Sequence, residues 1–98
     1  MRKNKKITCK DGFTMSVQAN EGAYCTPRRD GALKYTAVEV GYPSEREDLL
    51  IEWAETPGKP CDTVYVWVPA TQITLVVAKH GGIVSGELPP GIPYLTAT

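Results

Sequence analysis

Apolar and polar residues alternate along three segments in the first half of the chain, and this period of two predicts β-strands. Residues 7–10 form a short strand, and the Asp-Gly pair that follows suits a tight hairpin turn because glycine tolerates a positive φ. Residues 13–19 and 35–42 alternate more regularly and predict two further strands. Residues 20–34, which contain glycine and proline breaks, predict a long loop between them.

The clearest helix signal begins at Ser44. Ser44 and Glu47 have the spacing of a capping box, in which the hydroxyl and the carboxylate each accept a backbone amide of the first helical turn. The following turns place apolar residues on one stripe and acidic residues on the rest, which predicts a helix over residues 45–55. Residues 56–60, with two prolines and a glycine, end it as a rigid loop.

Residues 63–68 are a β-branched and aromatic run that is apolar on both sides. Strict alternation places its three valines on one face and Tyr65 and Trp67 on the other. A strand of this kind lies in the centre of a sheet or at an interface. The pattern leaves open whether Tyr65 and Trp67 face the core or the solvent.

Residues 70–80 fit either a helix or a strand. Pro69 suits the first position of a helix, and Gly81 or Gly82 suits its C-terminal cap. The many β-branched residues between them favour a strand instead. Residues 83–98, rich in proline and glycine, predict an extended tail that lies over the core or over a neighbour.

Together these elements predict an α+β fold in which a three- to five-stranded, mainly antiparallel sheet is packed by one or two helices, in the order βββαβα. At 98 residues the chain has room for one domain, 1–98. Residues 1–6 form a basic N-terminal arm, and 83–98 form the tail. A domain of this size gains stability from a second copy, so a homo-oligomer is an open possibility.

The formal charge of the chain is zero, with 11 basic and 11 acidic side chains, so no overall field attracts nucleic acid or anionic lipid. Residues 1–34 carry a surplus of five positive charges, and the rest carries the matching negative surplus. Direct nucleic-acid binding is therefore not expected, although one face is basic. The chain has no apolar run long enough to span a bilayer or to act as a secretory signal, which predicts a cytoplasmic protein without a membrane partner.

No pattern of chemistry-bearing residues predicts catalysis. Cys9, Cys25, Cys61 and His80 lack the close pairwise spacing of zinc ligands and of a cysteine nucleophile signature. Glycine-rich phosphate loops and a nucleophile elbow are also missing from the sequence. His80, just before two glycines, suits a cation at a helix C-terminus. We therefore expect no enzyme, catalytic residue, metal or cofactor.

The best candidate for binding is the loop around residues 24–30. Tyr24 offers an aromatic plane, and Arg28 and Arg29 offer guanidinium groups that recognise phosphate or carboxylate. Loops longer than a hairpin needs are often functional. With Tyr65 and Trp67 as possible surface aromatics, these five residues are the predicted binding residues. A solvated loop with Tyr24 packed into the core is the simpler interpretation.

Six segments, which together span most of the chain, carry a resemblance to a known group of proteins: residues 11–19, 24–28, 38–44, 63–65, 68–69 and 79–82. They resemble small accessory proteins encoded by tailed bacteriophages. The resemblance implies a phage product that acts in the cytoplasm of a host bacterium, where small non-enzymatic proteins block host defences by binding. Val66 and Trp67 depart from the pattern, which has Gly or Tyr there, and no functional residues are carried over.

Three hypotheses follow for the function. The first is an anti-CRISPR-like inhibitor that binds a bacterial defence complex, either through exposed Tyr65 and Trp67 or by charge mimicry from the acidic residues Glu45, Glu47, Asp48, Glu52 and Glu55. The second is an oligomeric sponge in which Tyr24, Arg28 and Arg29 hold a cyclic nucleotide signal. The third is a structural or regulatory phage protein without a small ligand.

Overall fold

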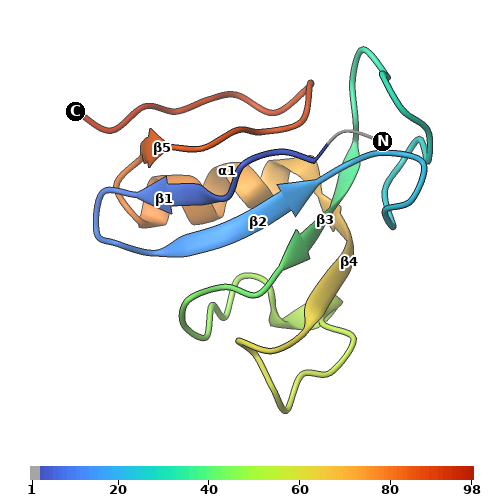
Figure 1. Cartoon of the computed structure of the whole chain (residues 1–98). Coiled ribbons are helices and arrows are strands. Elements are labelled where there is room, and N and C mark those ends of the chain that lie inside the picture. The colour runs from blue at the N-terminus through green and yellow to red at the C-terminus, as the bar shows by residue number, and fades with distance from the viewer. Residues whose placement is uncertain (1–2) are drawn as a thin grey trace.

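Residues 3–98 form one five-stranded antiparallel sheet, which packs against a single α-helix (Figure 1). This computed structural model describes residues 3–98, so the first two residues of the expected basic arm lie outside the described residues. The sheet order is β4-β3-β2-β1-β5, and the α+β prediction is confirmed. The elements are β1 (Ile7–Cys9), β2 (Thr14–Gln18), β3 (Ala37–Gly41), a 3-10 turn η1 (Ile51–Trp53), β4 (Val64–Pro69), α1 (Ala70–Lys79) and β5 (Ile83–Ser85).

The helical interpretation of residues 70–80 is correct. Ile73, Val76 and Val77 recur at helical spacing and are buried against the sheet, so burial of this stripe outweighs the weak helix propensity of the β-branched residues. Gly81 ends α1 at a φ of +90°, and the Gly82 amide donates to the Val77 carbonyl (3.0 Å) in a Schellman-type cap.

The predicted helix over residues 45–55 is wrong, because only η1 forms there. The two residues of the expected capping box bond to distant parts of the chain instead. The Ser44 hydroxyl accepts the Thr14 amide (2.9 Å), and the Glu47 carboxylate reaches His80 at the end of α1. Hydrogen bonds to distant residues therefore outweigh the local preference for a helix here. Glu47 is buried and does not belong to an acidic surface.

The alternation predicted for β4 is also wrong. Val38 pairs with Val68 and Val40 pairs with Tyr65, so β4 has one residue more than β3 over the same stretch. This bulge places both Tyr65 and Val68 in the core and pushes Trp67 outward at a φ of +48°. Tyr65 and Trp67 therefore do not share a face.

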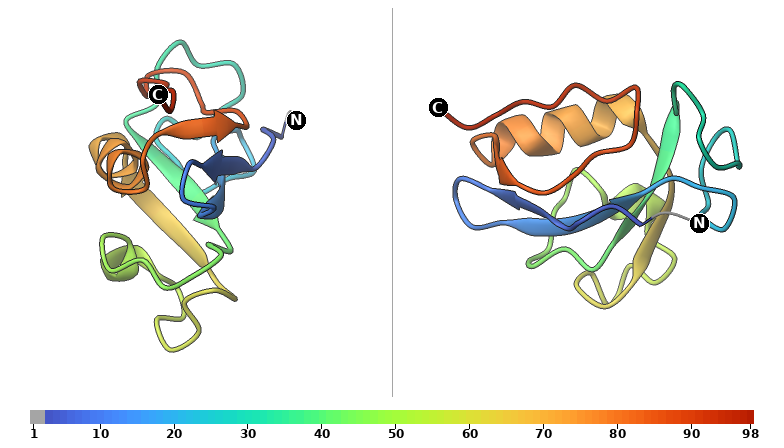
Figure 2. Two further views of the ribbon diagram at one scale, coloured as in Figure 1. Left: turned by 90° about the vertical axis from the view of Figure 1, so that its left-hand side faces the viewer. Right: turned by 45° about the horizontal axis from the view of Figure 1, so that its top comes forward.

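Both edges of the sheet are covered by other parts of the same chain. Along β5, the Ile83 amide donates to the Leu95 carbonyl (2.7 Å), and the tail returns beside the strand and across α1 (Figure 2). Along β4, the Glu55 amide donates to the Val64 carbonyl (3.0 Å). An oligomer formed by edge-to-edge strand pairing would have to displace these segments.

The described part of the basic arm is bonded to the sheet and to the tail. The Asn4 amide donates to Gln18 Oε1 (2.8 Å), and Gln18 Nε2 donates back to the Asn4 carbonyl (2.8 Å). The Lys5 amide donates to Glu87 Oε1 (2.8 Å), which places the start of the chain beside the tail.

An ionic cluster centred on the buried side chains of His80 and Glu47 ties three distant segments together. His80 Nδ1 lies 2.6 Å from Asp11 Oδ2 in the β1–β2 turn, and its Nε2 lies 2.7 Å from Glu47 Oε1 in the β3–β4 connection. The second Glu47 oxygen accepts Lys79 Nζ (3.0 Å). The Phe13 ring stacks on the imidazole with centroids 4.0 Å apart. Because both ring nitrogens face carboxylates, both must donate, which favours the charged imidazolium.

The pKa shifts of the cluster agree with this geometry. Burial alone would lower the pKa of His80, but its hydrogen bonds to Asp11 and Glu47 outweigh burial and raise it. Burial alone would raise the pKa of Glu47, but the Leu49 amide, His80 and Lys79 together lower it. The Phe13 amide, followed by His80, lowers the pKa of Asp11.

We predict that the protein is most stable between about pH 4.5 and pH 6.5. The raised pKa of His80 means that its contribution is complete below its ordinary value of 6.5 and is lost as the pH rises through the folded-state pKa. The lowered pKa values of Asp11 and Glu47 mean that their contributions are lost only at more acidic pH. Urea unfolding followed by tryptophan fluorescence at a series of pH values measures this profile.

The substitution Glu47→Gln tests the cluster directly. It leaves a buried imidazolium with one carboxylate, so we expect a loss of about 3 kcal/mol of unfolding free energy and a flatter pH profile. The matched control is Glu45→Gln, an exposed acid two residues away, which should change stability by about 0.5 kcal/mol or less. Stability that rises steadily from pH 6 to pH 9 in the unsubstituted protein would contradict this account.

Candidate functional site

Backbone hydrogen bonds hold the long loop between β2 and β3 against the outer face of the sheet, the face turned away from α1. The Thr26 amide donates to the Ala37 carbonyl (3.0 Å), which extends the ladder of β3 by one bridge. The Trp67 amide, which the bulge removes from the sheet ladder, donates to the Tyr24 carbonyl (3.1 Å). The bulge in β4 therefore places Tyr24 of the loop directly beside Trp67.

Tyr24, Arg28 and Trp67 form an exposed cluster, which we call the aromatic–arginine cluster. The Tyr24 and Trp67 rings lie 5.1 Å apart at 47°, and the Arg28 guanidinium lies 4.9 Å from the centre of the Tyr24 ring. Arg28 Nε also donates to the Glu21 carbonyl (3.2 Å). Tyr24 is 38% exposed and Trp67 is 48% exposed, so the cluster presents apolar area and a cation to solvent.

The other two predicted binding residues lie elsewhere. Tyr65 is completely buried, and its hydroxyl donates to the Pro60 carbonyl (2.5 Å), so it supports the core rather than a surface. The Arg29 side chain is exposed, but the contact with the Tyr24 ring is made by Arg28. The Arg29 backbone carbonyl accepts the Tyr35 hydroxyl (2.6 Å) and helps to fix the loop.

A groove of about 380 Å³ runs over the outer face of the sheet next to this cluster. Its floor consists of small or polar side chains of the sheet, and Tyr42 and the loop form its rim. The lining residues are Lys3, Ser16, Gln18, Asn20, Gly22, Ala23, Glu39, Gly41, Tyr42 and Val64. We call it the outer-face groove.

Glu39 connects the cluster with the groove. It is half-buried in the middle of β3 and lines the groove, and the backbone amide of Tyr24 in the cluster is near enough to influence its pKa. Burial raises its pKa and nearby Glu55 adds to the rise, while the Tyr24 amide, Arg28 and Lys3 oppose it. The carboxylate is thus poorly solvated although two cations lie near it.

Two aromatic residues beside the groove adopt a strained backbone conformation. Among residues 3–98, Tyr42 and Trp67 are the only residues other than glycine with a positive φ, and both have a φ of +48°. A bulky side chain in this region costs free energy, and such strain gathers at functional sites. Tyr42 is 57% exposed, so its side chain gains little from burial. At both positions the strained backbone therefore carries an aromatic ring that is exposed to solvent.

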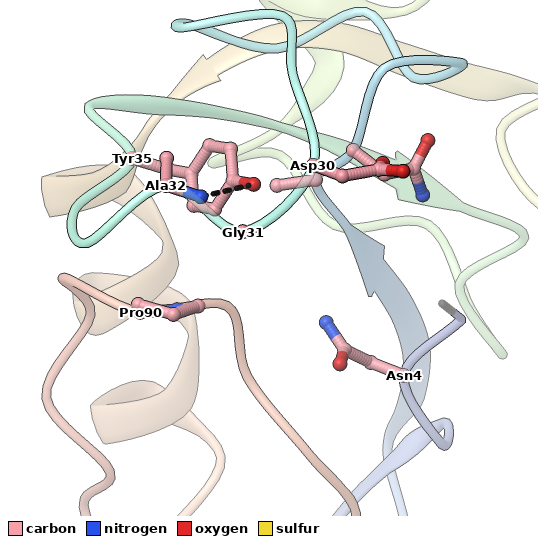
Figure 3. A pocket seen from close by; sticks show the side chains of 8 residues that line it. Asn4, Asp30, Gly31, Ala32, Tyr35 and Pro90 are labelled. Carbon is pink, nitrogen blue, oxygen red and sulfur yellow. Dashed lines mark hydrogen bonds between the residues drawn. The ribbon is translucent and has the colours of Figure 1, made fainter. Parts of the chain in front are cut away.

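A second hollow, of about 260 Å³, lies on the other side of the loop between Asn4, Asp30, Tyr35 and Pro90 (Figure 3). Its polar groups hold the loop. Asp30 Oδ1 accepts the Glu21 amide (2.9 Å), and the Tyr35 hydroxyl accepts the Ala32 amide (3.2 Å). The Tyr35 amide donates to the Pro90 carbonyl (2.9 Å). The hydrogen bonds around this hollow anchor the loop that carries the aromatic–arginine cluster.

His80 and the two buried cysteines, for which we expect no catalytic role, lie in surroundings that do not favour catalysis. Both nitrogens of His80 face carboxylates, and one face of its ring is covered by Phe13, which leaves it poorly placed to exchange protons with a substrate. Burial raises the pKa of the Cys9 and Cys25 thiols and so disfavours their nucleophilic thiolate forms. Over residues 3–98, no three His, Cys, Asp or Glu side chains come together as a metal site. No helix in the same range has the length and apolar character to cross a membrane.

Sequence reasoning missed Glu39, Tyr42 and the role of His80. His80 follows the buried stripe of α1 at the next helical position after Ile73, Val76 and Val77, and this periodicity predicts that it faces inward. For Glu39, a charged residue in an apolar strand indicates the outer face. The strain at Tyr42 has no signal in the sequence.

Comparison of the chain with known protein families, with curated proteins and with solved structures finds no match.

We predict that Tyr42→Gly is more stable than Tyr42→Ala by about 1 kcal/mol, because glycine relieves the left-handed strain that alanine keeps. The matched control is Thr36, an exposed position without positive φ, where the alanine variant should be as stable as the glycine variant or more so. Thermal and urea unfolding of the four variants measure both differences. The same order of stability at both positions would show that Tyr42 is not strained.

We predict that Tyr35→Phe lowers the free energy of unfolding by about 1 to 2 kcal/mol, because the Ala32 amide and the Arg29 carbonyl lose their buried partner. Amide hydrogen exchange in residues 29–35 should speed up as well. The control is Tyr94→Phe, which removes an exposed hydroxyl that donates to the Gly86 carbonyl (2.8 Å) and should cost about 0.5 kcal/mol or less. Equal effects of the two substitutions would contradict the anchoring role of Tyr35.

Proposed function

We propose that this protein is a non-enzymatic binding protein that holds a protein partner at the aromatic–arginine cluster. The observation that supports this best is that an exposed Trp67, which packs on Tyr24 while Arg28 covers the Tyr24 ring, is kept in a strained conformation by a bulge. Tryptophan, tyrosine and arginine are the residue types that dominate binding energy at protein interfaces. A strained tryptophan that is half exposed contributes more to such an interface than to the fold.

The resemblance to phage accessory proteins supports a more specific role. In this proposal the partner is a component of a bacterial defence complex in the host cytoplasm, and binding blocks it in the manner of an anti-CRISPR protein. Charge mimicry is the weaker version of this proposal, because buried Glu47 bonds to His80 and Lys79 and is not displayed. A structural or regulatory phage protein would use the same surface on a phage partner.

An oligomeric sponge for a cyclic nucleotide is the alternative proposal, and the Tyr24–Arg28 pair favours it. Two features oppose it. The centres of the Tyr24 and Trp67 rings are 5.1 Å apart, which leaves no space for a base to stack between them. The Glu39 carboxylate beside them repels a phosphate. We therefore favour a protein partner.

The experiment is affinity capture with the tagged full chain from extracts of bacteria that carry defence systems. We expect a stoichiometric partner whose recovery falls about tenfold with Trp67→Ala and with Arg28→Ala, since these remove the centre of the interface. Arg29→Ala is the matched control, because it removes the same charge one residue away and should leave recovery unchanged. Calorimetry with a panel of cyclic nucleotides tests the sponge.

Recovery that is equal for all three variants would place the interface elsewhere and contradict the proposal. Nucleotide binding that Arg28→Ala abolishes would favour the sponge instead.

A further inference from the structure

We propose that the outer-face groove receives a lysine or arginine side chain of the partner and pairs it with Glu39. The inference rests on the proposed function and adds the chemistry of the contact. It is drawn from the Glu39 carboxylate, the groove that this carboxylate lines and the Tyr42 side chain in the same groove.

The carboxylate is built into the wall of the groove. Glu39 lies in the middle of β3, where it pairs with Gln18 of β2 and stands opposite the bulge of β4, so its backbone is held within the sheet. The Tyr24 backbone amide is near the carboxylate and partly offsets the rise in its pKa that burial causes. A half-buried carboxylate held in this way gains more from a partner's cation than an exposed one does, because the charges interact in a medium less polar than water.

The charges around Glu39 come from three other segments. Glu55, in the connection before β4, repels it, while Arg28 of the loop and Lys3 of the N-terminal arm attract it. Arg28 is already committed to the Tyr24 ring and the Glu21 carbonyl. Lys3 lines the groove and is exposed, so it is the cation that a partner would replace.

The groove has room for the stem of such a side chain. Gly41, two residues after Glu39, forms part of the floor, and a Cβ atom built there would meet only the Ser16 Cβ, at 3.7 Å. Tyr42 stands at the rim in its strained conformation, and aromatic faces near a carboxylate favour a cation over an anion or a neutral group. The charge of Glu39 and the space over Gly41 therefore both favour a lysine or arginine side chain.

The test uses a short peptide as probe, so it does not require the partner. The ¹⁵N-labelled full chain is titrated with acetyl-Gly-Arg-Gly-amide, and citrulline in place of arginine provides a neutral peptide of the same shape. We expect the amide shifts of Glu39, Gly41 and Tyr42 to move with arginine, and binding at least about tenfold weaker with citrulline. Acidification should weaken arginine binding at a higher pH than the ordinary glutamate pKa of 4.5, because burial raises the pKa of Glu39.

Three substitutions and one control separate the possible causes. Glu39→Gln should weaken arginine binding about tenfold, whereas Glu52→Gln, an exposed acid outside the groove, should leave it unchanged. Gly41→Val should block the groove without unfolding the sheet, because valine suits a strand and space for its Cβ is present. Lys3→Gln should strengthen binding by removing the competing cation.

Peptide shifts scattered over the surface, equal binding of citrulline, or full binding to Glu39→Gln would overturn the inference. Any of these results leaves the capture experiment on Trp67 and Arg28 unaffected, so the two proposals fail separately.

Discussion

The fold depends on the imidazolium of His80 held between Asp11 and Glu47. These three residues come from the end of α1, the β1–β2 turn and the irregular β3–β4 connection, which have little other regular structure to join them. A charged ring this deeply buried is tolerated because both of its N–H groups donate to carboxylates. The cluster, together with the hydrogen bonds between Ser44 and Thr14 and the burial of Leu50, fastens the connection between β3 and β4 to the domain without a second helix.

The two faces of the sheet serve different purposes. The inner face buries valines, Met15 and Tyr65 against α1, and the ionic cluster closes this core at one end. The outer face carries small and polar residues, with the long loop held against it at Thr26 and Tyr24. Because the inner face and the covered edges stabilise the chain, the outer face is free to keep strained aromatic residues and a poorly solvated carboxylate.

The bulge in β4 links folding to the proposed function. One inserted residue turns Tyr65 and Val68 to the core, expels Trp67 and leaves a backbone amide that the Tyr24 carbonyl accepts. A regular strand would have kept Trp67 in alternation and left the loop without this bond. The same irregularity thus fixes the position of the loop and creates the aromatic–arginine cluster.

Periodicity in the sequence determined β1, β2 and β3, and glycine and proline breaks located the loop with Tyr24 and Arg28, because alternation and turn-forming residues are local properties of the chain. The sequence left residues 70–80 open between a helix and a strand, and the burial of Ile73, Val76 and Val77 against the sheet decided for the helix. The tertiary structure alone decided the hydrogen-bond partners of Ser44 and Glu47 and the burial of Tyr65 and Glu39. Ser44 and Glu47 bond to residues about 30 positions away, and no local pattern encodes that competition. The bulge depends on pairing with β3, so the burial of Tyr65 and the exposure of Trp67 exist only once the strands have met.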